Sequence, residues 1–474
     1  MYRLLLASLV AFIAPAAAQV ELAPLYPSPG AYAFNLVDMS NDGRVLVGYE
    51  IGPDGWYRSV RWEDGVLTVL PDLRDGAEAH YNLAGAVSAD GRVVYGYWGT
   101  GWDTPGQRET PYRWTEDTLV VAPDQWLVDI AGASADGSVA VGRGRPFSNR
   151  NGDQPFRWQP EGGGIEYLNA GTVTMGFAHG ASADGSQVAW HTSSFPSSPL
   201  VPFQAYRWQS GASTPLSGVK GYGAEGNTGF TYFHTPISDD GRTIYGEYLT
   251  GEVIEDDGPD AYVLGLRRWR DGAVTMLPFP PGGPSLDLHR CHPTAASADG
   301  RVVAGMCYGN AGNHYSPVIW REGEPPRFLP DDLAETFGID PAGWTFGCAS
   351  PDWPACAVRA LSGDGTAMTG VARYNGTFVV FRVGPPPAAL TVSETGDEPD
   401  ANLADGVCDV DPDSPGRQCT LRAALQTANE EPGADRITFD LSEARGGVAT
   451  ITLEGPLPVA TEPVEIDASP PAPR

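Results

Sequence analysis

Three aspartates in the segment DVDPDSPG have the spacing of a cation-binding loop. Asp409, Asp411 and Asp413 stand at alternate positions, and carboxylates at i, i+2 and i+4 open the oxygen-ligand loops that bind Ca²⁺. Ser414 replaces the loop glycine of that pattern, and Thr420 replaces its closing glutamate. The segment therefore predicts either a calcium site, the one cofactor that we consider, or a solvated acidic linker.

The cysteines are a second group that could do chemistry. All lie in the second half of the chain, at Cys291, Cys307, Cys348, Cys356, Cys408 and Cys419. In an oxidising compartment their short spacings predict three local disulfides, which are Cys291–Cys307, Cys348–Cys356 and Cys408–Cys419. A zinc site is the alternative for the cluster His289, Cys291, His292 and Cys307, although the spacing matches no familiar zinc module.

The sequence contains few signs of catalysis. GASADG at 132–137 and 180–185 is not the G-x-S-x-G nucleophile turn, and there is no P-loop, dinucleotide fingerprint or H-E-x-x-H motif. Several histidines precede a repeated turn, so we expect them near one rim or a central channel; the seven are His80, His179, His191, His234, His289, His292 and His314. Carboxylate pairs for glycoside hydrolysis depend on separation in space, which the sequence does not give.

A motif, S-x-D-G, recurs along the chain and indicates the elements that carry most of the histidines and some of the cysteines. Its seven serines are Ser40, Ser88, Ser134, Ser182, Ser238, Ser297 and Ser362. Six copies have a glycine eight residues after the serine, and the fourth has Trp190. After each copy a short run ends in an aromatic residue, which is Trp62, Trp114, Trp158, Trp208, Trp269, Trp320 or Phe381.

These repeats predict the fold. Asp-Gly between short alternating runs predicts a β-hairpin with positive φ at both central residues, and the serine can bond to the turn backbone. The runs hold β-branched and aromatic residues without a helical period, which excludes helical repeats. Such self-similarity predicts an all-β fold, a seven-bladed β-propeller over residues 19–383. We expect the aromatic residues to pack between blades and the repeated Ser and Asp to be structural.

The seventh repeat lacks its last strand. The chain start, VELAPL at 20–25, is similar in kind to the run that completes the first repeat. We therefore expect 20–25 to pair with 378–383 and to close the propeller with an N-terminal strand, which leaves no free edge.

The pattern of an aromatic before Trp, an acidic-Gly turn and S-x-D-G-x-x-V-x-G resembles the bacterial extracellular HAF repeats. The segment GWTFGCASPDWPACAVRALSGDG resembles the usual final repeat of that family. The resemblance covers residues 20–385, but the His-Ala-Phe triplet is absent, and AYRW at 205–208 comes closest. It implies an exported protein rather than a particular reaction.

The N-terminus and the charge indicate where the protein works. Residues 1–18 have Arg3, a short apolar run and Ala16 to Ala18, as in a secretory signal peptide. The net charge is −29, with Lys220 as the one lysine, and such a surface repels nucleic acids. We expect a monomer, without a transmembrane span, that is secreted or held on the outer surface of a Gram-negative bacterium.

Beyond a proline-rich linker at 384–392, residues 393–474 predict a second domain. Leu421, Ala424, Leu425 and Ala428 form one apolar stripe of a helix, and Thr420 is a suitable N-cap. Runs at 436–441, 448–458 and 463–469 predict three short strands.

This segment resembles the CSLREA domain, which precedes right-handed parallel β-helices in secreted and surface proteins. The matching residues are Cys408, Cys419, Leu421, Arg422, Ala424 and Asn429, whereas Thr420 and Ala423 replace the family's serine and glutamate. The resemblance implies a helix that caps a β-helix-like stub. Because fewer than three coils rarely bury a core, we expect either a fragment, or a stub that packs elsewhere or has little order after about residue 455.

The function that these features favour is a scaffold that binds an extracellular protein or polysaccharide, without catalysis. The alternative is a secreted carbohydrate-active enzyme, either a polysaccharide lyase or a glycoside hydrolase. Two or more carboxylates with Trp or Tyr in one pocket, away from the repeat positions, would favour the enzyme.

Overall fold

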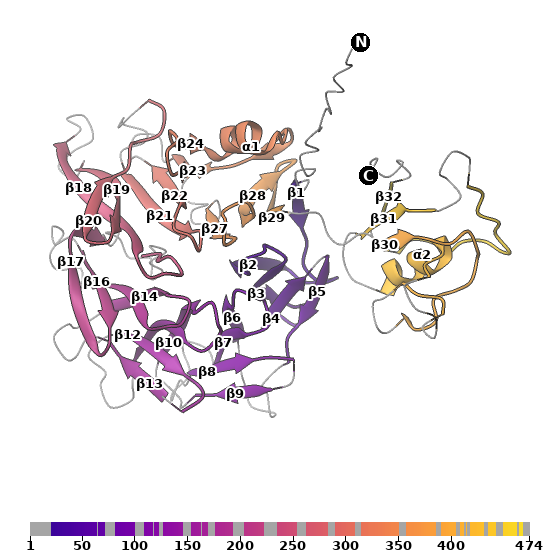
Figure 1. Cartoon of the computed structure of the whole chain (residues 1–474), viewed down its shortest axis with the longest axis horizontal. Helices are drawn as coiled ribbons and strands as arrows, with labels where there is room; N and C mark the ends of the chain where they lie inside the picture. Colours follow the sequence, from indigo (N-terminus) through magenta and orange to yellow (C-terminus); the bar gives the residue numbers. More distant parts are fainter. Residues whose placement is uncertain are drawn as a thin grey trace, which may run out of the picture.

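The described part of the chain is all-β apart from two helices, and its sheets are arranged around a common centre with a separate C-terminal unit (Figure 1). A computed structural model describes residues 20–467, except for 64, 72–80, 100–108, 117, 123–126, 146–152, 163, 169–175, 193–202, 222–234, 254–261, 283–289, 309–313, 350–356, 385–389, 404–407, 412–413, 415–417, 431–434, 442–448 and 462–463. The predicted signal peptide lies outside these residues. No helix in the described part of the chain is long and apolar enough to cross a membrane.

Antiparallel strands follow one another in short groups. In chain order they are β1 (Glu21–Leu25); β2 (Ala33–Met39), β3 (Val45–Ile51), β4 (Tyr57–Glu63) and β5 (Val66–Val69); β6 (Tyr81–Val87), β7 (Val94–Gly99), β8 (Glu109–Trp114) and β9 (Leu119–Val121); β10 (Leu127–Ala133), β11 (Ala140–Arg145), β12 (Gln154–Gln159) and β13 (Gly164–Tyr167); β14 (Gly176–Ala181), β15 (Gln187–Thr192), β16 (Phe203–Gln209) and β17 (Ala212–Gly221); β18 (Thr243–Val253), β19 (Tyr262–Arg270) and β20 (Ala273–Met276); β21 (Arg290–Ala296), β22 (Val302–Tyr308), β23 (His314–Arg321) and β24 (Arg327–Phe328); β25 (Trp344–Thr345), β26 (Cys348–Ala349), β27 (Val358–Leu361), β28 (Met368–Tyr374) and β29 (Thr377–Gly384). The groups from β2 to β24 pair in sequence order, as a meander does. In the last group β27, β28 and β29 pair in order, β25 also pairs with β28, and β26 pairs with β23.

Every S-x-D-G copy forms the same turn. In six copies the turn joins two consecutive strands, and in the fifth it precedes β18, with Ile237 and Ile244 bridged across it. At the first copy, Gly43 N donates to Ser40 O (3.0 Å), Val45 N donates to Ser40 Oγ (3.0 Å), and Ser40 Oγ donates to Asp42 Oδ1 (2.6 Å). The glycine has φ of 72°, but no turn aspartate of the seven copies has positive φ. The expected hairpin is confirmed, whereas positive φ at both central residues was wrong, because the serine and aspartate side chains hold a longer turn.

The predicted pairing of the N-terminal strand with the last repeat is confirmed. β1 pairs antiparallel with β29, with Leu22 opposite Val383 and Leu25 opposite Val380. Arg382 is 1% exposed and reaches from β29 to the first turn, where its Nη2 donates to Gly43 O (3.1 Å). Its guanidinium carbon also lies 4.9 Å from the centre of the Trp62 ring. The N-terminal strand and the first repeat are thus joined to the last.

The repeated turns are joined to one another by backbone hydrogen bonds. The links run from Asn41 N to Ala89 O, Ala89 N to Ala135 O, Asp136 N to Ala183 O, Ala183 N to Asp239 O, Asp239 N to Ala298 O, Asp299 N to Gly363 O, and Gly363 N to Asn41 O, with lengths of 2.7 to 3.2 Å. The last link returns to the first turn, so these bonds form a complete circuit. The residue between Ser and Asp makes most of them through its backbone.

The aromatic residue that ends the third strand is buried in most groups. Trp62, Trp158, Trp208, Trp269, Trp320 and Phe381 are each at most 9% exposed, and burying a tryptophan contributes roughly 4 to 6 kcal/mol. Arginines one residue before such an aromatic reach the next group, as Arg157 does over Trp208 (4.6 Å) and Arg207 over Trp269 (4.8 Å). The inter-blade packing role that we predicted for these aromatics agrees with this arrangement.

One helix in this part of the chain was missed by the prediction. α1 (Leu329–Phe337) follows the short β24 and ends at Gly338 in the left-handed conformation. Asp332 on α1 is buried and accepts two bonds from Arg321, from Nε and Nη2 to its two oxygens (both 2.9 Å). Leu329 and Leu333 bury the apolar side of α1 against β23 and its neighbours, so tertiary packing stabilises a helix of only nine residues.

The C-terminal unit combines α2 (Leu421–Glu430) with a three-stranded parallel sheet of β30 (Leu390–Val392), β31 (Asp435–Phe439) and β32 (Val464–Asp467). The predicted helix is confirmed, and Ala423 N donates to Thr420 Oγ1 (3.0 Å), as an N-cap requires. Leu390, Ile437 and Ile466 lie at matching positions of neighbouring strands.

Three predictions for this unit were wrong. Residues 390–392 belong to its sheet rather than to the linker, residues 449–458 form no strand, and β32 gives order beyond residue 455. The Ala423 side chain is fully buried in the core under α2, so packing occupies the position where a capping glutamate was expected.

Candidate functional site

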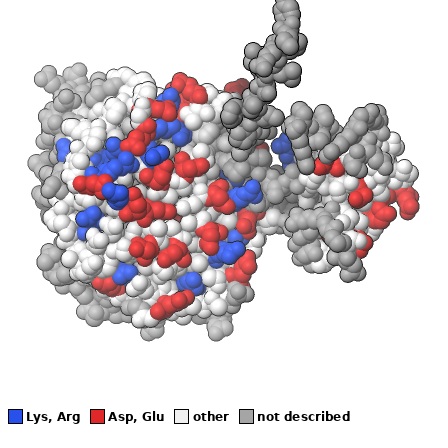
Figure 2. All heavy atoms as spheres, in the orientation of Figure 1, with Lys and Arg blue, Asp and Glu red and all other residues white. Residues whose placement is uncertain are grey.

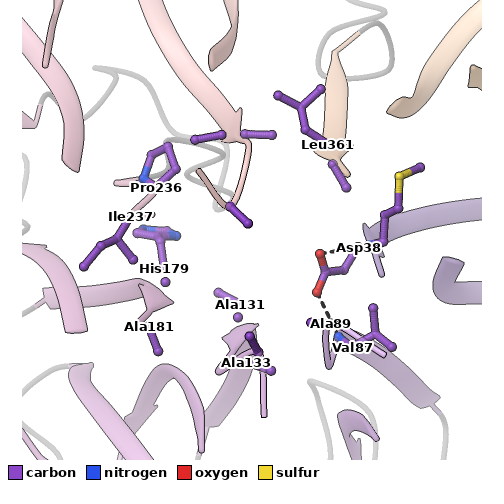
Figure 3. A pocket seen from close by; sticks show the side chains of 18 of the residues that line it. Asp38, Val87, Ala89, Ala131, Ala133, His179, Ala181, Pro236, Ile237 and Leu361 are labelled. Carbon is purple, nitrogen blue, oxygen red and sulfur yellow. Dashed lines mark hydrogen bonds between the residues drawn. The ribbon is translucent and has the colours of Figure 1, made fainter. Parts of the chain in front are cut away.

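The candidate site is a cavity of about 150 Å³ between the first strands of the groups (Figure 3). Six of these strands carry a β-bulge at the same place, three residues before the repeated serine; the bulged residues are Val37, Gly85, Ala131, His179, Thr294 and Arg359. A bulge redirects the extra side chain. Five of these six residues line the cavity, all except Gly85.

A second layer of the cavity comes from the residue between Ser and Asp of the turns. Four copies have alanine there and the seventh has Gly363, but the first has Asn41 and the fifth has Asp239. Asn41 Nδ2 donates to Asp239 Oδ2 (3.1 Å), although the two residues are 198 positions apart. Burial raises the pKa of Asp239, helped by the nearby Asp240 carboxylate, whereas the bond from Asn41 lowers it.

Asp38 is a second carboxyl group in the cavity. Its Oδ1 accepts a hydrogen bond from Met39 N (2.9 Å) and its Oδ2 accepts one from Val87 N (2.8 Å). Burial nevertheless raises the pKa of Asp38 to about 6, because desolvation outweighs both bonds. Two carboxyl groups with raised pKa values therefore share one cavity.

His179 lies on the other side of the cavity from Asp38 (Figure 3). Its ring stacks on His191, with 4.9 Å between centroids, and both rings stack near Phe177. The Arg143 guanidinium covers the Phe177 ring at 4.7 Å. His179 thus brings the end of a stacked column of rings to the cavity. Histidines before the turns were expected near one rim or a central channel, and His179 occupies the second of these places.

A second cavity, of about 180 Å³, lies near Tyr245 and Trp320 and includes Glu322 and Glu324. Trp320 has a structural role here, because it is the buried aromatic residue of its repeat and its Nε1 donates to Pro278 O (2.7 Å). Glu322 is paired with Arg268 and with Arg270 (2.8 Å). The central cavity has two carboxyl groups but no Trp or Tyr in its described lining. The second cavity has both, but Trp320 is at a repeat position, Tyr245 Oη donates to Gly300 O (2.9 Å), and Glu324 is paired with Arg327.

Several predicted site residues have structural partners. Cys291 is bonded to Cys307 and Cys408 to Cys419, which confirms two disulfides and rules out the zinc alternative for the first pair. His292 is hydrogen-bonded through Nδ1 to the buried Glu247 and stacks on Tyr308. The partner predicted for Cys348, Cys356, lies outside the described residues, as do His80, His234 and His289.

The predicted calcium loop is only partly described. Asp409 Oδ1 accepts bonds from Asp411 N (3.1 Å) and Gln418 N (3.3 Å), and Asp411 Oδ2 accepts one from Ser414 Oγ (2.6 Å). Asp413 lies outside the described residues. No group of three possible metal ligands occurs in the described ranges, and the calcium site stays a prediction.

The comparisons with known proteins find structures but no families. No family model and no curated protein matches the chain. Among solved structures, the chain is similar to the β-propeller domain of the trilobed protease from Pyrococcus furiosus (9% identity, TM-score 0.45, 75% of this chain and 93% of that one). Others are an oligogalacturonate lyase from Vibrio parahaemolyticus (10%, 0.43, 77% and 97%) and TolB from Acinetobacter baumannii (14%, 0.35, 61% and 67%).

Proposed function

We propose that this protein is a secreted or surface-held binding scaffold, a closed seven-bladed β-propeller that presents its variable loops to an extracellular protein or polysaccharide. Support for the closed ring comes from the circuit of backbone bonds between the seven turns and from the pairing of β1 with β29. The HAF-like repeats and the CSLREA-like unit are part of this proposal, as is export through the N-terminal signal peptide.

The observation that carries the proposal is a contrast between the two ends of the strands. At one end every group has the same S-x-D-G turn, with its side chains bonded within the turn. At the other end the connection from second to third strand varies, from the tight turn after Tyr374 to the long segment between Thr192 and Phe203. A constant scaffold with variable loops is the arrangement typical of binding proteins.

The second candidate is a carbohydrate-active enzyme, and one observation favours it. Asp38 and Asp239 both have raised pKa values in one cavity, and such pairs can divide acid and base roles. The Asn41 bond to Asp239 and the two backbone bonds to Asp38 favour a structural role for both carboxyl groups.

One experiment separates the candidates. The secreted protein is incubated with a panel of polysaccharides, and binding is scored by affinity electrophoresis while cleavage is scored by release of reducing ends or unsaturated products. We expect binding without cleavage, unchanged in Asp38→Asn. Cleavage that Asp38→Asn abolishes would establish the enzyme instead. Recovery of the protein only from the cytoplasm would contradict the proposed location.

A further inference from the structure

Three tyrosines are exposed where the chain enters its first repeat. Tyr26, Tyr32 and Tyr57 have exposed fractions of 59%, 74% and 39%. Elsewhere in the described residues the aromatic side chains are more buried, except Phe378, whose ring is covered by Arg373 at 3.9 Å. Packing does not require three exposed rings in one group, and exposed aromatic clusters mark binding surfaces.

The two segments that carry these rings are bonded to each other. Tyr32 N donates to Ile51 O (2.8 Å), and its hydroxyl donates to Pro53 O (3.3 Å). Ser28 N donates to Glu50 Oε2 (3.0 Å). Residues 28–32 therefore lie against residues 50–53.

The Tyr57 ring is also held in place. It packs on Tyr49 with 5.6 Å between centroids, and Tyr49 Oη accepts a bond from Asn35 Nδ2 (3.3 Å). A tyrosine has two side-chain torsions, so a ring already held by its neighbours loses little entropy on binding. Tyr32 and Tyr57 are therefore held in place before any partner arrives.

The loop that carries Tyr57 also carries charged groups. Asp54 and Arg58 form an ion pair (2.8 Å) whose charges cancel beside the loop. The exposed aliphatic residues of the repeats lie instead on the outer strands β5, β9 and β20, at Val69, Leu119, Val121, Val274 and Met276. A protein interface would be expected to include such aliphatic groups in its core.

A sugar fits this combination of groups. The face of an aromatic ring is partially negative and attracts the C–H groups on the flat side of a pyranose. The sugar hydroxyls can then bond to the polar groups around the ring. An anionic polymer is disfavoured, because the chain carries a net charge of −29, with acidic side chains spread widely over the surface in Figure 2.

We propose that Tyr26, Tyr32 and Tyr57 form a binding platform for a neutral polysaccharide. This inference rests on the proposed binding function and specifies its ligand class.

The test uses the full secreted chain and affinity electrophoresis with hydroxyethylcellulose and galactomannan as neutral probes and polygalacturonate as the anionic one. Tyr32→Ala/Tyr57→Ala should weaken binding to a neutral probe about tenfold or more. Tyr32→Phe/Tyr57→Phe keeps the ring faces and should stay within about threefold of the wild type. Val274→Ala/Met276→Ala removes exposed apolar area elsewhere and should have no effect on binding. The single variant Tyr32→Ala provides a second test of the platform if the double variant does not fold.

Three results would overturn the platform. The first is no binding of the wild type to either neutral probe, and the second is binding to polygalacturonate alone. The third is neutral-probe binding that all the tyrosine variants retain, which would leave the proposed scaffold function standing with its glycan site elsewhere. Capture of a protein that the tyrosine variants lose would refute the glycan as ligand but keep the scaffold.

Discussion

At the scale of single residues, the cavity contains a carboxyl group whose ionisation the fold resists. The pKa of Asp38 is raised from 3.8 to about 6 by burial. The native state therefore holds this proton up to a higher pH than the unfolded chain does. Asp38 consequently lowers the stability of the native state as the pH rises from about 4 to about 6, and the loss persists above that range.

Substituting Asp38 tests this directly. The stability of the wild type relative to Asp38→Asn should fall by about 2 kcal/mol between about pH 4 and about pH 7, because asparagine does not ionise. Urea unfolding of both proteins at the two pH values measures the difference, in which other titrating groups cancel. A difference that does not change with pH would show that Asp38 titrates normally.

A second prediction at this scale concerns the junction between the first and last repeats. Arg382→Lys should cost about 2 to 4 kcal/mol, since lysine cannot both bond to Gly43 O and lie flat over Trp62. Arg61→Lys is the matched control, because Arg61 contacts Gly91 O in the interior of the repeat series, and it should cost about 1 kcal/mol. Equal midpoints for wild type and Arg382→Lys in urea would contradict this role.

At the scale of the elements, the glycine eight residues after the repeated serine sits against the first strand. A Cβ at Gly142 would lie 1.9 Å from Asp129 O, and one at Gly48 would lie 2.0 Å from Asn35 O. The fourth group has Trp190 instead, opposite the small Ala178, and its ring stacks on Tyr206 at 4.3 Å. The repeat thus requires glycine wherever the two strands approach this closely.

Gly142→Ala should therefore lower the free energy of unfolding by about 3 kcal/mol. Gly272→Ala is the control, since Gly272 has φ of 84° but open space around its Cβ, and should cost about 1 kcal/mol. Thermal unfolding followed by circular dichroism compares the two. If Gly272→Ala proved the more damaging, backbone conformation rather than strand contact would explain the repeat glycine.

The sequence predicted some of these elements because their signals are local. The S-x-D-G turn, the Thr420 cap and the apolar stripe of α2 each depend on residues a few positions apart. The β1 partner followed from a missing strand in the repeat. The bulges did not follow, because a bulge is a mismatch between two strands, and so the cavity position of Arg359 was not predicted. Asn41 and Asp239 differ visibly from the alanines of other copies, and that difference was the signal missed.

At the scale of the whole molecule, β1 covers an edge that would otherwise expose the backbone of β29. Deleting 20–25 should lower the unfolding midpoint and promote association through that edge. A synthetic peptide of residues 20–25, added in excess, should restore the midpoint and reverse the association, and a scrambled peptide should not. Size-exclusion chromatography and thermal unfolding report both effects. A monomeric deletion variant with the wild-type midpoint would contradict the role given to β1.

The contact between Arg382 and Gly43 joins residues 339 positions apart. At a ribosomal rate of about 5 to 20 residues per second, roughly 20 to 70 seconds pass between the synthesis of the two. During that interval the first strand has no partner. Because this contact needs Arg382, the first and last repeats join only late in synthesis. A chain that has not yet made this contact can still pass through a translocation pore.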